Sequence, residues 1–194
     1  STSRLYEKEP AQLGMTPNTY RNGGQDIQMT YTIVNCPFGQ VLVAATDKGV
    51  CAVRLGDDDA SLEAALKKEY PKACVERDDG QLHEWVGLIL AMLEGHPITQ
   101  SLPLDVRATA FQRRVWQHLM TIPRGETQTY SQVAEALGEP RSTRAVANAC
   151  AANPVALVVP CHRVIRQDGG LGGYRWGIER KAAILERESM PESD

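Results

Sequence analysis

The first part of the chain carries short runs of β-branched and other apolar residues separated by turn sequences, as β-strands do. Three such runs follow one another at 29–34, 41–45 and 50–55. The turn sequences between them are Pro37-Phe38-Gly39 and Asp47-Lys48-Gly49. Because turns this short join antiparallel neighbours, the pattern predicts a meander of three antiparallel strands.

Two segments with apolar residues at helical spacing come next. Asp59 opens the first of these helices and Pro71 stops it. The second has an apolar stripe from Trp85 to Leu93 and ends at Gly95. Residues 97–103, which contain two prolines, predict a linker to the rest of the chain.

The second half of the chain predicts a mostly helical domain. Thr109 can cap a first helix, and a short helix starts at Thr129 or Tyr130. The sequence Gly138-Glu139-Pro140 breaks this short helix, and a further helix runs from the N-cap Ser142 to about residue 152. A short helix, a tight turn and a second helix are typical of a helix-turn-helix, although many helix pairs share this pattern.

The second helix of this pair is unusually slim, because most of its residues are small. It contains Ala145, Ala147, Ala149, Ala151 and Ala152. A slim helix can approach a groove about 6 Å wide, which is the width of the minor groove of DNA. Tight packing against neighbouring helices explains the same composition, so both interpretations stay open.

The charge is distributed unevenly along the chain. The formal net charge is -3, but residues 105–188 hold 12 basic and 8 acidic side chains, against 9 and 14 in residues 1–104. Eleven of those twelve basic residues are arginines, which hold phosphates bidentately. The second half is therefore charged as a DNA-binding surface is, although an ordinary solvated surface can have the same charge.

The composition is that of a globular protein, with 42% hydrophobic and 23% charged residues. No apolar run approaches the ~20 residues that a membrane span requires. The polar start of the chain, residues 1–10, has no apolar signal-peptide core. We therefore expect a soluble, cytoplasmic protein with no membrane partner.

Most of the five cysteines predict small buried side chains and no metal site. Their number is odd and no close Cys-x-x-Cys pair occurs, which argues against a disulfide framework. Cys36, Cys51, Cys74 and His83 could converge on zinc only by accident of folding, since zinc sites have regular spacings.

Cys161 has the neighbours that a reactive cysteine needs. It follows residues 155–159, whose length and apolar composition predict a buried strand, and it precedes His162 and Arg163. A nearby base and a positive charge favour the thiolate, which is the nucleophilic form of cysteine. A Cys-His pair can equally be structural, so the pair alone does not define a function.

The stretch from Phe111 to Glu188 resembles the O6-alkylguanine-DNA alkyltransferase family. Pro160-Cys161-His162-Arg163-Val164 is similar to the active-site motif of that family. Further matching motifs are Phe-Gln-x-x-Val-Trp at 111–116, Ile122-Pro123-x-Gly125-Glu126-Thr127, Thr129-Tyr130, Arg144-Ala145-Val146, Asn153-Pro154 and Gly173-Tyr174-Arg175-Trp176-Gly177. The last of these motifs resembles the version of the domain that forms the C-terminal part of a bacterial adaptive-response protein.

The resemblance implies an α/β fold class and a reaction. The family fold is a small ribonuclease-H-like domain, here residues 27–103, followed by a mostly helical domain with a helix-turn-helix, here residues 104–191. The family repairs double-stranded DNA by moving an alkyl group from O6 of guanine, and from O4 of thymine, onto a cysteine. The resulting thioether is permanent, so each protein molecule acts once. We expect a monomer that needs no cofactor.

The resemblance also implies catalytic roles for five residues. Cys161 would accept the alkyl group, His162 would act as its base through a water, and Glu188 would orient His162. Asn153 would brace the turn that presents Cys161. Tyr130 would place a hydroxyl near the guanine O6 and the target phosphate.

The same resemblance implies a DNA-binding surface and a base pocket. Arg144 would fill the gap left by the extruded guanine, and the surface would also include Ser142, Ala145, Ala149 and Tyr130. The pocket would be lined by Pro160, Tyr174, Arg175 and Trp176.

Arg175 and Trp176 depart from the pattern of the family, in which Ser followed by Gly is frequent at these positions. The departure removes the side chain that would donate directly to O6. The bulk of Trp176 predicts a pocket that accepts a methyl group better than a benzyl group. The alternative is that Trp176 points away and packs on the helix that starts at Ile178.

Residues 1–26 predict a loosely structured lead-in. Leu13-Gly14-Met15-Thr16-Pro17 and Tyr20-Arg21 resemble the end of an AraC-type DNA-binding module. We therefore expect these residues to be the tail of a preceding regulatory module, with a native flexible N-terminus as the alternative.

Three other functions are compatible with parts of this pattern. A non-catalytic alkyl-damage-binding protein of the same fold would lack Cys161, which is present here. A transcription regulator would need only the helix-turn-helix. A Cys-His hydrolase would turn over and would require an oxyanion hole, which the sequence does not locate.

Overall fold

The computed structural model describes residues 24, 26–96 and 100–190, so most of the predicted lead-in lies outside the described residues. Its N-terminal half is built on a sheet with the strand order β3-β2-β1-β4. The strands are β1 (Gln28–Cys36), β2 (Gly39–Thr46), β3 (Gly49–Gly56) and β4 (Cys74–Arg77). The antiparallel pairing of the first three strands confirms the predicted meander.

The sequence prediction missed β4. This strand pairs in parallel with β1, from Gln28 opposite Cys74 to Tyr31 opposite Arg77. It has only four residues, and none of them is buried. A short, exposed, charged segment has no apolar pattern, so only its pairing with a distant part of the chain makes it a strand.

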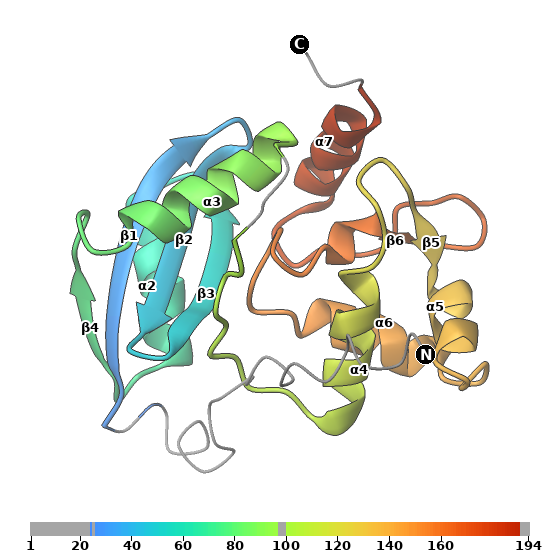
Figure 1. Ribbon diagram of the computed structural model, residues 1–194, viewed down its shortest axis with the longest axis horizontal. Coiled ribbons are helices and arrows are strands. Elements are labelled where there is room, and N and C mark those ends of the chain that lie inside the picture. The colour runs from blue at the N-terminus through green and yellow to red at the C-terminus, as the bar shows by residue number, and fades with distance from the viewer. Residues whose placement is uncertain (1–23, 25, 97–99, 191–194) are drawn as a thin grey trace, which may run out of the picture.

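Each face of the sheet is covered by a helix, as Figure 1 shows. Helix α2 (Asp59–Glu69) buries Leu62 and Leu66 against one face. Helix α3 (His83–Glu94) packs on the other face, in a core that continues into the C-terminal half. Because successive residues of a strand point to opposite faces, β2 supplies both cores.

The C-terminal half is mostly helical, as the sequence predicted. Its elements are α4 (Ala110–Leu119), β5 (Gln128–Thr129), α5 (Tyr130–Ala136), α6 (Thr143–Ala151), the 3-10 helix η1 (Cys161–Arg163), β6 (Val164–Ile165) and α7 (Ile178–Ser189). Thr109 caps α4 through a reciprocal capping box with Gln112. Helices α5 and α6 form the predicted helix pair, and Gly138 lies at the turn between them.

Ser142 lies at the N-cap of α6, but its side chain makes no capping hydrogen bond, contrary to the prediction. Its Oγ instead donates to Glu139 Oε2 at 3.1 Å, because Glu139 in the preceding turn offers a charged acceptor. The helix therefore starts at the predicted place for a different local reason.

The two halves are joined along the free edge of β3. Val50 of β3 exchanges backbone hydrogen bonds with the chain around Leu104, and Val53 does so with the chain around Val155. These contacts satisfy an edge that would otherwise be unpaired. Within the described part of the chain, no helix is long and apolar enough to span a membrane.

Candidate active site

The segment before Cys161 is a buried turn, whereas the sequence predicted a strand. Residues 154–160 form bends and turns with a single bridge at Val155, and Leu157 adopts a positive φ of 71°. An apolar run fits a buried turn as well as a strand when its backbone groups find other partners. Asn153 supplies two of them.

Asn153 is fully buried and holds this turn from inside. Its side-chain oxygen accepts from the Val155 amide at 3.0 Å, and its Nδ2 donates to the Val159 carbonyl at 2.9 Å. The same Nδ2 lies 3.2 Å from Cys161 Sγ. One amide side chain therefore fixes both the turn and the thiol that follows it.

Cys161 opens into a cavity of about 430 Å³. Pockets that hold small ligands are typically about 300–1,000 Å³ in volume. The lining residues come from α5, α6, η1 and the loop before α7, and they are Tyr130, Ala147, Asn148, Cys150, Ala151, Cys161, Gly173, Tyr174 and Arg175. We call this space the Cys161 cavity.

Burial and nearby donors have opposite effects on the pKa of the Cys161 thiol. Burial raises the pKa of Cys161, and the Asn153 hydrogen bond, Lys181 and Arg175 oppose the rise. The net direction is upward, so the thiol is protonated at rest. Loss of its proton must therefore be coupled to a nearby base.

His162 has the protonation state that such a base needs. Burial lowers the pKa of His162, against the opposing effect of Glu188, so the ring is neutral. Its Nε2 lies 3.0 Å from Glu188 Oε1. A carboxylate accepts only, so Nε2 carries the hydrogen and Nδ1 keeps the lone pair. Nδ1 is buried without a hydrogen-bond partner among the described residues.

Glu188 is held in its charged form by two partners. Burial raises the pKa of Glu188, but hydrogen bonds from His162 and Arg163 outweigh burial and bring it to about 2. Arg163 donates to both carboxylate oxygens, at 2.8 and 3.0 Å, and to the Ile122 carbonyl at 2.6 Å. The carboxylate is therefore available to stabilise a protonated His162.

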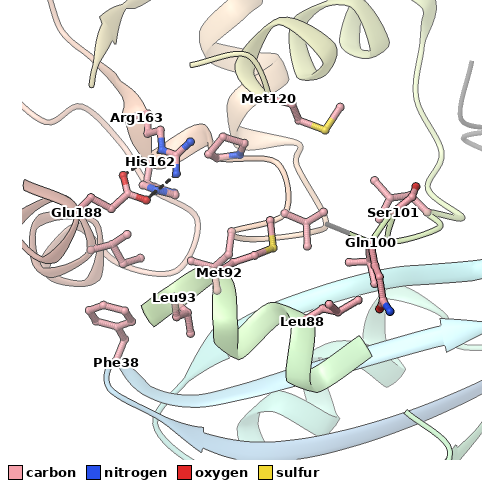
Figure 2. A pocket seen from close by; sticks show the side chains of 16 residues that line it. Phe38, Leu88, Met92, Leu93, Gln100, Ser101, Met120, His162, Arg163 and Glu188 are labelled. Carbon is pink, nitrogen blue, oxygen red and sulfur yellow. Dashed lines mark hydrogen bonds and ion pairs between the residues drawn. The ribbon is translucent and has the colours of Figure 1, made fainter. Parts of the chain in front are cut away.

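A second cavity, of about 350 Å³, is lined by His162, Arg163 and Glu188 and is drawn in Figure 2. The picture shows Arg163, His162 and Glu188 on one side, joined by dashed lines, with Met92 and Leu93 of α3 opposite them. Cys161 does not line this second cavity. Cys161 and His162 therefore line two different cavities.

Burial also changes the pKa values of the two tyrosines that line the Cys161 cavity. Burial raises the pKa of Tyr130 to about 12, and it raises the pKa of Tyr174 well above its ordinary value. Both phenols are therefore protonated and able to donate a hydrogen bond. Tyr174 also lies edge-on to His162, with 6.5 Å between the ring centroids.

The loop that carries Tyr174 depends on a glycine beside Tyr130. Gly172 has a φ of 72°, and a Cβ added there would lie 2.8 Å from Tyr130 Oη. Gly138 has a similar φ of 75° with open space around its Cβ position. Both glycines thus need a left-handed backbone, but only at Gly172 would an added side chain meet Tyr130.

We expect Gly172→Ala and Gly138→Ala each to lower the free energy of unfolding by about 1 kcal/mol, the cost of a left-handed alanine. Gly172→Ala should also slow the alkyl transfer that the family resemblance implies, because it displaces Tyr130, while Gly138→Ala should not. Urea unfolding and single-turnover kinetics measure the two effects. Equal transfer rates in the two variants would show that the contact with Tyr130 is irrelevant.

The predicted DNA-contacting residues of α6 and its N-cap differ in their exposure. Arg144 and Ala145 are exposed on α6, and Ser142 is partly exposed. Ala149 is buried, and its carbonyl accepts a hydrogen bond from Trp116 Nε1 at 2.8 Å, so this alanine offers almost no surface for contact with DNA. Helix α6 buries Val146, Ala149 and Cys150 at helical spacing, which the alanine content alone did not reveal.

Two of the predicted pocket residues do not line the Cys161 cavity. Pro160 lines the second cavity, and Trp176 is 8% exposed and belongs to the main core. Trp176 packs edge-on against Tyr174, with 5.2 Å between the ring centroids. The prediction that Trp176 narrows the entrance of the Cys161 cavity is therefore wrong, because this large aromatic side chain is buried in the core instead. Tyr174 and Arg175 do line the cavity.

Sequence reasoning assigned no role to Lys181, although it is fully buried beside the site. Its Nζ donates to the carbonyl of Val164 at 2.6 Å and lies 3.4 Å from the carbonyl of Gly173. Burial lowers its pKa, and Cys161 and Cys150 oppose that change. Lysine in an amphipathic helix usually lies at the surface, so no sequence signal marked this one.

No cluster of three or more His, Cys, Asp or Glu side chains suited to a metal ion occurs within residues 24, 26–96 and 100–190. All five cysteines are free thiols.

Family models match both halves of the chain. Residues 29–106 match the ribonuclease-like domain of 6-O-methylguanine DNA methyltransferase, and residues 110–190 match the DNA-binding domain of the same family. Together with the ribonuclease-like sheet half and the helical half, these matches define the class of protein. The chain belongs to the O6-methylguanine-DNA methyltransferase family.

Curated relatives agree with this membership. The chain is 47% identical over 191 residues to the bifunctional transcriptional activator/DNA repair enzyme Ada of Escherichia coli (strain K12). That match covers 98% of this chain and 54% of the relative, so the chain spans about half the length of Ada. A methylated-DNA--protein-cysteine methyltransferase of Mycolicibacterium paratuberculosis is 38% identical, with 84% of this chain and 95% of the relative covered.

Solved structures share the fold as well. The crystal structure of Mycobacterium tuberculosis OGT in complex with DNA has a TM-score of 0.68 and 34% identity, covering 84% of this chain and 93% of that one. The O6-methylguanine methyltransferase of the same organism has a TM-score of 0.69 and 34% identity, covering 85% and 96%. The fold class inferred from the sequence is confirmed.

Proposed function

We propose that this chain repairs double-stranded DNA by transferring the alkyl group of O6-alkylguanine, and of O4-alkylthymine, to Cys161 in a single irreversible event. The observation that carries the proposal is the position of Cys161. Its thiol lies in a cavity beside the exposed face of α6, next to the neutral His162 and the charged Glu188. The family membership of the chain supports the same reaction class.

In the proposed mechanism, His162 takes the thiol proton through a water as Cys161 Sγ attacks the alkyl carbon. The charged Glu188 stabilises the protonated ring through its contact with Nε2. The S–C bond forms while the C–O6 bond breaks, and the electron pair of the broken bond stays on guanine. Guanine takes up one proton from Tyr130, which recovers it from His162. The thioether product has no hydrolytic route back to thiol, so the protein is consumed.

The target base must leave the helix before it reaches Cys161. The O6 atom lies inside the duplex, and extrusion of a base costs a few kcal/mol. The Cys161 cavity is the proposed receptor for the extruded base, with Tyr174 and Arg175 in its wall. Arg144 is exposed on α6 and is the proposed substitute for the base in the stack.

We expect Arg144→Ala to slow repair of a methylated duplex about tenfold or more, while reaction with free O6-methylguanine is unchanged. Only the duplex reaction requires extrusion, whose cost of a few kcal/mol the arginine offsets. Single-turnover rates on the two substrates test this, and Lys67→Ala on α2 controls for the lost positive charge. Equal slowing on both substrates would refute a role in base extrusion.

We further propose that the chain binds the minor groove through α6, with little dependence on sequence, and acts as a monomer in the bacterial cytoplasm. Phosphate contacts from arginines should make the affinity for DNA fall with salt.

The proposed domains are 27–103 and 104–191, with residues 1–26 as the tail of an AraC-like module. Separate family-model matches to residues 29–106 and 110–190 support the division into the two later domains.

Peptide mapping after reaction with a methylated duplex tests the proposed function. We expect one added methyl group, located on Cys161. Cys150 lines the same cavity and is the internal control for site selectivity. A methyl group on Cys150, or an unmodified protein that nevertheless binds the damage, would contradict the proposal.

A further inference from the structure

Arg175, in the wall of the Cys161 cavity, is tied to the N-terminal half of the protein. Its Nη2 donates to Glu69 Oε2 at 2.7 Å, although 106 positions separate the two residues. Glu69 is the last residue of α2, in the ribonuclease-like half. A pocket residue of one half is therefore held by a carboxylate of the other.

The carboxylate of Glu69 is itself fixed from behind. Arg54 of β3 forms an ion pair with the same Oε2 atom. The side chains of Arg54 and Glu69 are 8% and 16% exposed, so this pair is held within the fold. Glu69 thus presents a fixed anchor to Arg175, whose side chain is 31% exposed and would keep more rotamer freedom without it.

A continuous series of contacts leads from this anchor to the nucleophile. The Nη1 atom of Arg175 donates to the backbone carbonyl of Asn153 at 3.3 Å. The side chain of Asn153 in turn holds Cys161 Sγ and the carbonyl of Val159. The series therefore ends on the atom that reacts and on the turn that presents it.

We propose that Glu69 is a positioning residue for alkyl transfer, which fixes Arg175 in the wall of the Cys161 cavity and, through Asn153, the place of the thiol. The inference rests on the proposed function. It gives the ribonuclease-like half a direct part in the reaction, because the N-terminal half supplies the anchor of one wall of the site.

The ion pair has a matched control on the same helix. Glu63 of α2 pairs with Arg77 at the surface, 3.5 Å between Oε1 and Nη1, and does not line the Cys161 cavity. Glu63→Gln therefore removes a carboxylate of α2 without disturbing Arg175. Glu69→Gln removes the anchoring charge at nearly constant volume.

The test measures the rate of methyl transfer at saturating duplex, the affinity for the same duplex, and the unfolding temperature. We expect Glu69→Gln to slow transfer about tenfold with little change in DNA affinity, since a misplacement of about 1 Å can cost up to about a hundredfold. Glu63→Gln should match the parent protein in all three measurements.

Arg175→Gln removes the link while leaving the pair between Arg54 and Glu69 intact. If Glu69 acts through Arg175, the double variant should be no slower than the slower single variant. Independent, multiplying losses would overturn the inference, as would a Glu69→Gln protein that reacts at the parental rate. A slower Glu69→Gln protein whose loss follows a lower unfolding temperature would show a merely structural role and would also overturn it.

The proposed function and this inference fail in different ways. A parent protein that transfers no methyl group overturns the function and the inference together. A parent protein that transfers normally, with an unaffected Glu69→Gln variant, overturns the inference alone.

Discussion

Cys161→Ala is expected to abolish alkyl transfer altogether while leaving the binding of damaged duplex DNA in place. The thiol is the only group in the proposed mechanism that forms a bond to the alkyl carbon, so no residual route remains. The exposed face of α6, with Arg144, is untouched by the change. Labelled methyl transfer and a DNA-binding titration measure the two properties.

Cys161→Ser tests the same point with less change in volume, and the exposed Cys74 provides the control. Cys74→Ala should transfer at the parental rate. Transfer by the Cys161→Ala protein would show that another residue accepts the alkyl group. Loss of DNA binding together with loss of transfer would show that the substitution damaged the fold instead.

Glu188→Gln is expected to slow transfer by about 10² or more, within the range that general acid-base groups supply. The variant leaves His162 without the charge that stabilises its protonated form, and it leaves Arg163 without its carboxylate. Glu186→Gln, an exposed position on the same helix, is the matched control. A Glu188→Gln protein with the parental rate would remove Glu188 from the mechanism.

The same substitution should reveal the acid sensitivity of the fold. The pKa of Glu188 is about 2, below its ordinary value of 4.5, so its stabilising effect is complete above pH 4.5 and is lost as the pH falls through 2. That depression corresponds to roughly 3 kcal/mol at neutral pH. The difference in unfolding free energy between parent and Glu188→Gln should shrink over this window. If the difference in unfolding free energy between the two proteins stayed constant with pH, the lowered pKa of Glu188 would not be the source of the stabilisation.

Much of the fold could be predicted from the sequence because its elements have strong local signals. The meander has β-branched runs between tight turns, and α4 has a capping box at Thr109. The strand β4 and the turn before Cys161 could not be predicted in the same way. Each depends on partners far away in the chain or on the single buried side chain of Asn153.

The candidate site was predictable to the extent that its residues lie in short motifs. Cys161 and His162 follow from the local sequence, and the resemblance to the family adds Asn153. Glu188 lies 26 positions from His162, and only the resemblance pointed to it. Lys181 and Glu69 have no local signal, because a charged residue in an amphipathic helix looks like a surface residue until the fold buries or pairs it.

Stoichiometry tests the central claim most directly. The protein is mixed with a several-fold excess of duplex carrying O6-methylguanine, and the repaired guanine formed is counted against the protein present. We predict one guanine restored per protein molecule, after which repair stops and the intact mass shows one added methyl group. Continued repair beyond one guanine per protein, with the protein mass unchanged, would contradict irreversible transfer to Cys161.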